Sequence, residues 1–222
     1  SAHVLNSGPK LSGDNEHVES NTSAAHEQTR EFPQPKGFLA AAKNVGIKDT
    51  TLDLTLIHST ARARAAAMFT RNRFPGAPVI VGREHIVDGF VQALVINSKN
   101  ANVATGQQGI DDAIAMCRAA ASELDIDFRD VLPFSTGVIG RFLPREKIAA
   151  GFAPVFAKLG DSPDHLIAAA RGMMTTDTVH KLATRVIITP EGKVKEGKYE
   201  GLSVKDARKQ ILADLEAEGL LK

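Results

Sequence analysis

The feature of this sequence that most constrains its fold is a change of hydrophobic period along the chain. Around residues 52–57, leucines alternate with mostly polar residues, which is the two-residue period of a half-buried strand. Farther along, apolar residues recur at helical spacing, at Ile110, Ala113, Ile114, Cys117, Ala121 and Leu124. Strands interleaved with helices of this length predict an α/β domain rather than a helical bundle or a β-sandwich.

Local signals predict where the individual elements lie. Strands are expected at residues 52–57, 65–69, 78–81, 93–96 and 131–134, and the Asn- and Gly-rich stretch 97–109 is expected to be a loop. The helix with the apolar stripe is expected to carry Asp111 and Asp112 in its first turn. Another helix should open at Pro144 and close near Gly160, and a last one should begin at Ser203.

Composition and charge argue against several classes of function. The 27 basic residues nearly cancel the 26 acidic ones, so the chain lacks the positive field that nucleic acids or anionic membranes attract. No apolar run approaches the roughly 20 residues that cross a bilayer, so a cytoplasmic protein is expected, or one of the mitochondrial matrix in a eukaryote. The spacing of His3, His17 and His26 matches no ligand pattern, so no metal site is expected. Cys117, the single cysteine, is expected to pack as a small hydrophobic residue.

The sequence divides into three parts by texture. Residues 1–35 are rich in Ser, Asn, Glu and His and lack apolar periodicity, which predicts a disordered polar tail. Residues 36–185 carry the strand and helix patterns of the α/β domain, and residues 186–222 are expected to form a helical tail of different origin.

Four stretches in the α/β part stand out for their chemistry. They are residues 37–48 with the segments 53–54, 69–72 and 77–79 after them; 97–102 (Asn-Ser-Lys-Asn-Ala-Asn) with Thr105 and Gly106; 135–140 (Ser-Thr-Gly-Val-Ile-Gly) with Leu143 and Pro144; and 174–178 (Met-Thr-Thr-Asp-Thr) with Lys181. In this order they resemble the amino-terminal half of the ornithine acetyltransferase family. The resemblance implies a layered sheet-and-helix domain.

The resemblance also implies roles for particular residues. Thr136 and Gly137 correspond to the family's oxyanion-stabilising pair, and either Thr175 or Thr176, with Thr176 preferred, corresponds to a threonine that binds the amino-acid substrate. Taken without the family, residues 135–137 are a strand-to-helix turn, and residues 174–178 are a helix end with exposed hydroxyls. The family usually has glycine where Lys99 stands, so a positive backbone angle there would strain the lysine.

The function implied is that of the amino-terminal (α) subunit or remnant of a glutamate/ornithine N-acetyltransferase of arginine biosynthesis. Such an enzyme transfers acetyl from acetylornithine to glutamate without a cofactor, and its nucleophile is the first threonine of a second (β) subunit. After Lys181 this sequence shows neither the family's lysine-containing loop nor its cleavage motif, so no nucleophile is assigned and whether the chain is itself an enzyme stays open.

Residues 189–222 resemble instead a fragment of a valyl-tRNA synthetase, which suggests a truncated or chimeric chain. An oligomer is expected, because an exposed apolar sheet face would seek a partner. The alternative is a non-catalytic α/β domain with a helical tail that binds a partner.

Overall fold

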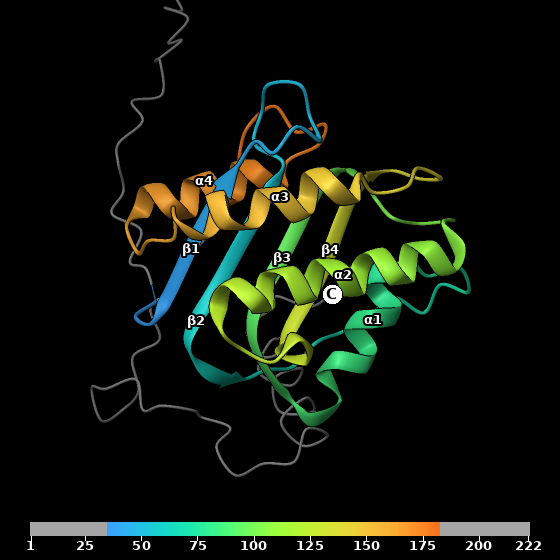
Figure 1. Ribbon diagram of the computed structural model, residues 1–222, viewed down its shortest axis with the longest axis horizontal. Coiled ribbons are helices and arrows are strands. Elements are labelled where there is room, and N and C mark those ends of the chain that lie inside the picture. Colours follow the sequence, from blue (N-terminus) through green and yellow to red (C-terminus); the bar gives the residue numbers. More distant parts are fainter. Residues whose placement is uncertain (1–34, 183–222) are drawn as a thin grey trace, which may run out of the picture. The chain divides into compact units, whose positions relative to one another are not determined.

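The computed structural model describes residues 35–182, which are coloured in Figure 1. The expected polar tail, apart from its last residue, lies outside the described residues. So do the valyl-tRNA synthetase-like stretch and the helix expected at Ser203. Within the described part, no helix is both long enough and apolar enough to span a membrane.

Four strands form a single sheet in residues 35–182, in the spatial order β1-β2-β3-β4. Their bounds are β1 (Phe38–Lys43), β2 (Leu54–Arg64), β3 (Phe90–Asn100) and β4 (Val131–Val138). Strand β2 is antiparallel to both β1 and β3, whereas β3 and β4 are parallel, with Asn97 opposite Ser135 and Lys99 opposite Gly137. The carboxyl ends of β3 and β4 therefore meet at the same edge of the sheet.

In the described part of the chain, four α-helices cover the sheet: α1 (Ala77–His85), α2 (Gly106–Leu124), α3 (Arg145–Phe156) and α4 (Pro163–Met173). Two 3₁₀ turns, η1 (Ile86–Asp88) and η2 (Phe128–Asp130), precede β3 and β4. Figure 1 shows α1, α2 and α3 in front of the sheet and α4 behind β1.

Two neighbouring residues of β2 show that α3 and α4 lie on opposite faces. Side chains alternate between faces along a strand. A Cβ added to Gly151 of α3 would lie 3.2 Å from Leu54 Cδ2, and one added to Gly172 of α4 would lie 2.1 Å from Thr55 Oγ1. The face that bears Leu54 thus carries the main core, and the face that bears Thr55 carries α4.

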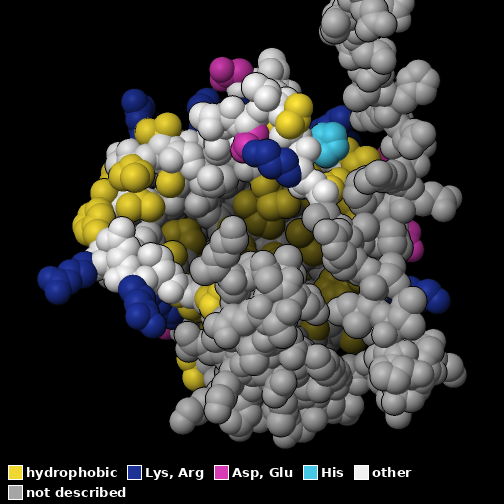
Figure 2. All heavy atoms as spheres, turned by 180° about the vertical axis from the view of Figure 1, so that it is seen from behind, with side chains coloured by type: hydrophobic (Ala, Val, Ile, Leu, Met, Phe, Trp, Pro, Cys, Tyr) yellow, Lys and Arg dark blue, Asp and Glu magenta, His cyan; other side chains and the backbone are white. Residues whose placement is uncertain are grey.

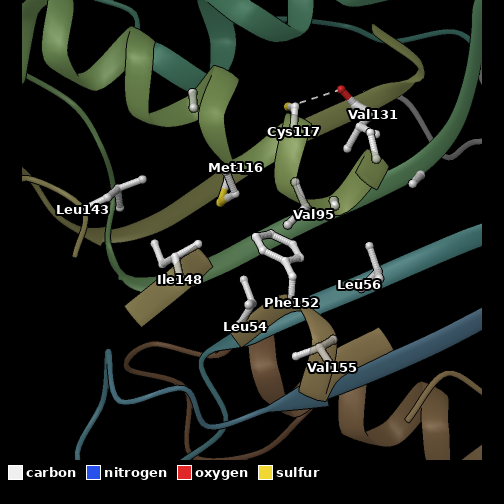
Figure 3. Packing of buried hydrophobic residues seen from close by; sticks show 14 of the residues in the cluster. Leu54, Leu56, Val95, Met116, Cys117, Val131, Leu143, Ile148, Phe152 and Val155 are labelled. Atoms are coloured by element: carbon white, nitrogen blue, oxygen red, sulfur yellow. Dashed lines mark hydrogen bonds between the residues drawn. The ribbon is translucent and has the colours of Figure 1, made fainter. Parts of the chain in front are cut away.

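The core fills the space between the sheet and helices α1 to α3. Figure 3 shows the ring of Phe152 pointing toward Val95, with Leu54 and Leu56 on either side. Cys117 of α2 is fully buried here, as predicted for a small hydrophobic residue, and burial raises the pKa of its thiol to about 12. The thiol should therefore be unreactive until the core opens.

The predicted class and several elements are confirmed. The structure is a mixed α/β domain. Strands β3 and β4 and helix α2 contain the residues that the sequence assigned to them, whereas β2 begins at Leu54, two residues later than predicted. Helix α4 was not predicted. Helix α3 begins after Pro144 as expected but ends at Phe156, whereas Gly160 forms a bridge with Ala40 of β1.

Two predicted strands are wrong. Residues 65–69 form no strand, because after Ala65 donates to the Gly89 carbonyl at 2.8 Å the chain leaves the sheet. Residues 78–81 lie in α1, where Pro78 stands in the first turn and Ala77 and Val81 are buried one turn apart. A four-residue apolar run satisfies either period, so only the packing decides between them.

The predicted loop at 97–109 is also wrong over most of its length. Strand β3 continues to Asn100, because Asn97 and Ser98 find partners in β4, and α2 already begins at Gly106. Asp111 and Asp112 consequently lie beyond the first turn of the helix. The buried Asp112 forms an ion pair with Arg145 at the start of α3.

The core makes a direct prediction for the substitution Phe152→Ala. The Phe152 residue is 1% exposed, so the substitution should lower the free energy of unfolding by about 3–5 kcal/mol through lost burial and a cavity. Phe156→Ala on the same helix is the matched control, because Phe156 is 39% exposed and should cost about 1 kcal/mol or less. Urea titration measures both changes, with the reactivity of Cys117 toward a thiol reagent as the signal for unfolding. Equal losses in the two variants would contradict the assigned core.

Candidate functional site

A cavity of about 670 Å³ opens where β3 and β4 end. Its lining brings together the four residues that the sequence predicted for the site, which are Thr136, Gly137, Thr175 and Thr176. Thr136 is half-buried and the other three are exposed. The remaining lining residues are Lys48, Asp49, Thr50, Thr51, Lys99 and Val138.

The end of β4 presents Thr136 on the side of the sheet that α4 covers. Thr136 pairs with Ser98 of β3, and the Ser98 hydroxyl donates to the Gly172 carbonyl of α4 at 2.6 Å. Paired residues of neighbouring strands point to the same face, so the Thr136 side chain shares this side. Within residues 35–182 its hydroxyl makes no hydrogen bond, which leaves it open to a ligand in the cavity.

Gly137 permits an unusually close approach of the two strands. Its φ is +133°, and a Cβ at this position would lie 2.1 Å from the Lys99 carbonyl oxygen. A larger residue would have to push the strands apart. A glycine amide next to a threonine hydroxyl, both at a cavity wall, is a donor arrangement that can stabilise an oxyanion.

The buried carboxylate of Asp53 shapes the loop whose residues 48–51 also line the cavity. One of its oxygens accepts from the Val45 amide at 2.8 Å, and the other accepts from the Lys48 amide at 2.7 Å. These two bonds hold the chain as it turns between β1 and β2, so residues 48–51 are presented to the cavity. Hydrogen bonds to a charged group are among the stronger ones in proteins.

Lys48 fastens this loop to the end of α4. Its ammonium donates to the Leu52 carbonyl at 3.0 Å and to the Met174 carbonyl at 2.5 Å. Burial lowers the pKa of Lys48, and the nearby Asp53 carboxylate opposes that shift. Because Thr175 and Thr176 follow Met174 directly, this contact places their segment at the cavity.

Lys99 occupies a strained position at the same cavity. Its φ is +95°, where side-chain-bearing residues are rare, and such a conformation costs on the order of 1–3 kcal/mol. The positive angle that would strain a lysine is therefore present. Its ammonium lies 3.6 Å from the Asp49 carboxylate, across the cavity from β3 to the loop.

Side-chain hydrogen bonds connect the asparagine-rich stretch 97–102 to β4, to its own backbone and to α2. Ser135 donates to Asn97 Oδ1 at 2.6 Å, and Asn97 Nδ2 donates to the Asn100 carbonyl at 2.9 Å. Asn102 Nδ2 donates to the Gly109 carbonyl at 2.8 Å. The two bonds from the Asn97 and Asn102 amides are the side-chain to backbone bonds expected of an Asn-rich cluster. In the described part of the chain, no group of His, Cys, Asp and Glu is placed to hold a metal ion.

The sequence placed Lys48 and Lys99 in its motifs without predicting that their side chains line the cavity. It did not single out Asp49, Thr50 or Thr51 at all. A lysine in a position where the family usually has glycine was the one available signal for Lys99. The contact between Lys48 and Met174 spans 126 residues, and no local pattern encodes it.

Known proteins resemble this chain over its α/β part. The model of the ArgJ family matches residues 39–198, which runs past residue 185, the expected end of the α/β domain. The arginine biosynthesis bifunctional protein ArgJ of Caldanaerobacter subterraneus is 46% identical over 159 residues, covering 72% of this chain and 39% of that protein. The ArgJ protein of Neisseria meningitidis is 44% identical over 171 residues, covering 76% and 39%. The chain thus spans about two fifths of the length of these curated relatives.

Two solved structures are similar to this fold. The crystal structure of the arginine biosynthesis bifunctional protein ArgJ from Bacillus halodurans superposes with a TM-score of 0.63 at 38% identity, covering 65% of this chain and 75% of that one. The ornithine acetyltransferase of Mycobacterium tuberculosis, solved in complex with ornithine, gives a TM-score of 0.65 at 36% identity, with 68% and 82% covered.

The contact between Lys48 and Met174 can be tested by Lys48→Met. The variant keeps most of the side-chain volume but loses both bonds to carbonyls, so the free energy of unfolding should fall by about 1.5 kcal/mol. Amide hydrogen exchange at residues 174–177 should become faster, because their anchor is gone. Lys147→Met is the control, since Lys147 donates to the Gly46 carbonyl of the same loop from an exposed position. Unchanged exchange at 174–177 in Lys48→Met would show that the contact does not hold this segment.

Proposed function

The chain belongs to the ArgJ family, and from this premise we propose that it is the amino-terminal part of a glutamate/ornithine N-acetyltransferase of arginine biosynthesis. One observation carries the proposal: Thr136 and Gly137 stand at the end of β4 in the same cavity as Thr175 and Thr176. An acyltransferase needs oxyanion donors beside a site for the amino acid, and this cavity offers groups suited to both tasks. A cytoplasmic location, or the mitochondrial matrix in a eukaryote, fits such a role.

In this proposal Thr136 and Gly137 stabilise the tetrahedral intermediate. When a nucleophile attacks the acetyl carbonyl, negative charge develops on the carbonyl oxygen, and donors fixed in advance lower the barrier without reorganisation. The Thr136 hydroxyl and the Gly137 amide are the donors. Removal of one such donor typically raises the barrier by about 2.7–4 kcal/mol.

Thr176, or its neighbour Thr175, is proposed to bind the amino-acid substrate. Both hydroxyls line the cavity, and the contact between Lys48 and Met174 fixes the segment that carries them. The M. tuberculosis relative was solved with ornithine bound, so acetylornithine as donor and glutamate as acceptor are the proposed substrates. Acetyl transfer between two amines through an acyl-enzyme needs no cofactor.

The nucleophile of the reaction is proposed to come from a second polypeptide, the β subunit, whose first residue is a threonine. Its free amine can act as the base that activates its own hydroxyl. The apolar side chains on the α4 side of the sheet suit such a partner. Phe134 and Val138 of β4 are exposed, and Figure 2 shows hydrophobic side chains gathered on this side, opposite the view of Figure 1. Exposed apolar patches commonly mark interaction surfaces, in assemblies or between subunits.

Reconstitution tests the proposal. The full chain alone should give no transfer of acetyl from acetylornithine to glutamate above background. Mixed with a polypeptide that begins at the nucleophilic threonine of the C. subterraneus relative and continues to its end, the chain should give ping-pong kinetics. In that mixture Thr136→Ala should lower kcat by about 100-fold or more, whereas Thr136→Ser, which keeps the hydroxyl, should retain most of the activity.

Two results would count against this function. A burst of acyl-enzyme from the chain alone would mean that a nucleophile lies within it. A mixture that forms a stable complex without acquiring activity would favour the alternative of a non-catalytic domain that binds a partner.

A further inference from the structure

Lys99 lines the cavity in a strained backbone conformation, and the interactions of its side chain are too weak to offset the cost of that strain. Its backbone is strained, at φ +95°, and its side chain is 45% exposed. Its ammonium makes one ion pair among residues 35–182, to Asp49, at 3.6 Å and with an Asp49 side chain that is 97% exposed. Exposed ion pairs of this kind contribute little to stability. A strained residue at a cavity, without a stabilising contact to match, points to a role in binding.

The two lysines of the cavity differ in what their ammonium groups have left to bind. Lys48 is committed to two carbonyl oxygens, those of Leu52 and Met174. Among the described residues, the Lys99 ammonium has one long ion pair, to Asp49, so it has capacity for another anion. The positive charge of Lys48 is also compensated by the nearby Asp53 carboxylate, so Lys99 supplies the less compensated positive charge of the cavity lining. Such a cavity favours a ligand that carries a carboxylate.

The place of Lys99 in the sheet fixes which carboxylate it can reach. Lys99 is paired with Gly137, and adjacent strands lie about 4.8 Å apart. In an N-acyl α-amino acid, only the amide nitrogen and Cα separate the acyl carbon from the α-carboxylate. An acyl oxygen at Thr136 and Gly137 therefore leaves the α-carboxylate a few ångströms away, within the span of a flexible lysine side chain.

We propose that Lys99 binds the α-carboxylate of the N-acyl amino acid in this cavity, and that Asp49 holds the ammonium in place when no ligand is bound. The inference rests on the proposed function and names a specificity-determining residue for it. Asp49 then acts as an internal competitor, because the ligand carboxylate must displace it. The two side chains should consequently have opposite effects on affinity.

Calorimetric titration of the full 222-residue chain with acetylornithine tests the proposal. Lys99→Met should weaken binding about fivefold, Lys99→Arg should restore it, and Asp49→Asn should strengthen it about twofold. The α-carboxamide of acetylornithine, which lacks the negative charge, should bind all these variants alike. Added salt should weaken binding of the acid but not of the amide.

Lys99→Gly provides a second variant that cannot fail through backbone strain. Glycine adopts a φ of +95° freely, so this variant should fold, with a melting temperature about 2–4 °C higher, and still lose affinity for the acid as Lys99→Met does. Asp125→Gly is its control, because Asp125 also has a positive φ, of +54°, but lies at the end of α2 and does not line the cavity. Its affinity for acetylornithine should be unchanged.

The double variant Asp49→Asn/Lys99→Met tests whether Asp49 competes with the ligand carboxylate for Lys99 or only adds negative charge to the cavity. If Asp49 competes for Lys99, the gain from Asp49→Asn should vanish once Lys99 is gone. Equal affinity of the unaltered chain and Lys99→Met for the acid would overturn the inference, and so would a lack of binding to the unaltered chain. Neither result would decide the proposed function, which the acetyl-transfer assay of the reconstituted mixture tests separately.

Discussion

The close approach of β3 and β4 at Gly137 is the constraint on which the site depends. Parallel strands need a crossover, and α2 supplies it. The crossover places the apolar stripe of α2 on the sheet and brings both carboxyl ends to one edge. At that edge the backbone of Lys99 lies so near Gly137 that no side chain fits between them. Thr136, Gly137 and Lys99 all line the cavity at this edge, and Lys99 has a positive φ there.

The rest of the site is assembled around this edge by buried polar groups. Asp53 fixes the loop between β1 and β2 through two backbone amides, and Lys48 ties that loop to the end of α4. The two Asp53 bonds join residues 8 and 5 positions apart, whereas the bond from Lys48 to Met174 spans 126 residues. Loss of either one would leave the threonines of residues 175–176 without a fixed position relative to Thr136, and catalysis by positioning tolerates little such error.

The cavity combines neutral donor groups, whose role the family implies, with a charged pair, Lys99 and Asp49, whose role is proposed for this chain. Oxyanion donors are neutral groups and serve the acyl carbonyl, which every substrate of an acyltransferase shares. The ammonium of Lys99 and the carboxylate of Asp49 form an exposed pair across the opening. If they act as proposed, they select the rest of the substrate, so that acyl chemistry and substrate recognition come from adjacent residues of the paired strands.

The sequence by itself determined the α/β class of the fold and singled out residues 135–140 as a motif. Long periodic segments such as α2, and the strand ending at Thr136 and Gly137, carry their structure in their local pattern. The tertiary structure alone decided the cases where the pattern was short or the partner distant. Residues 78–81 became helix because packing resolved an ambiguous period, and 97–100 became strand because β4 offered partners. Lys48 and Lys99 joined the site through contacts with distant residues, and hydrophobic periodicity carries no information about such contacts.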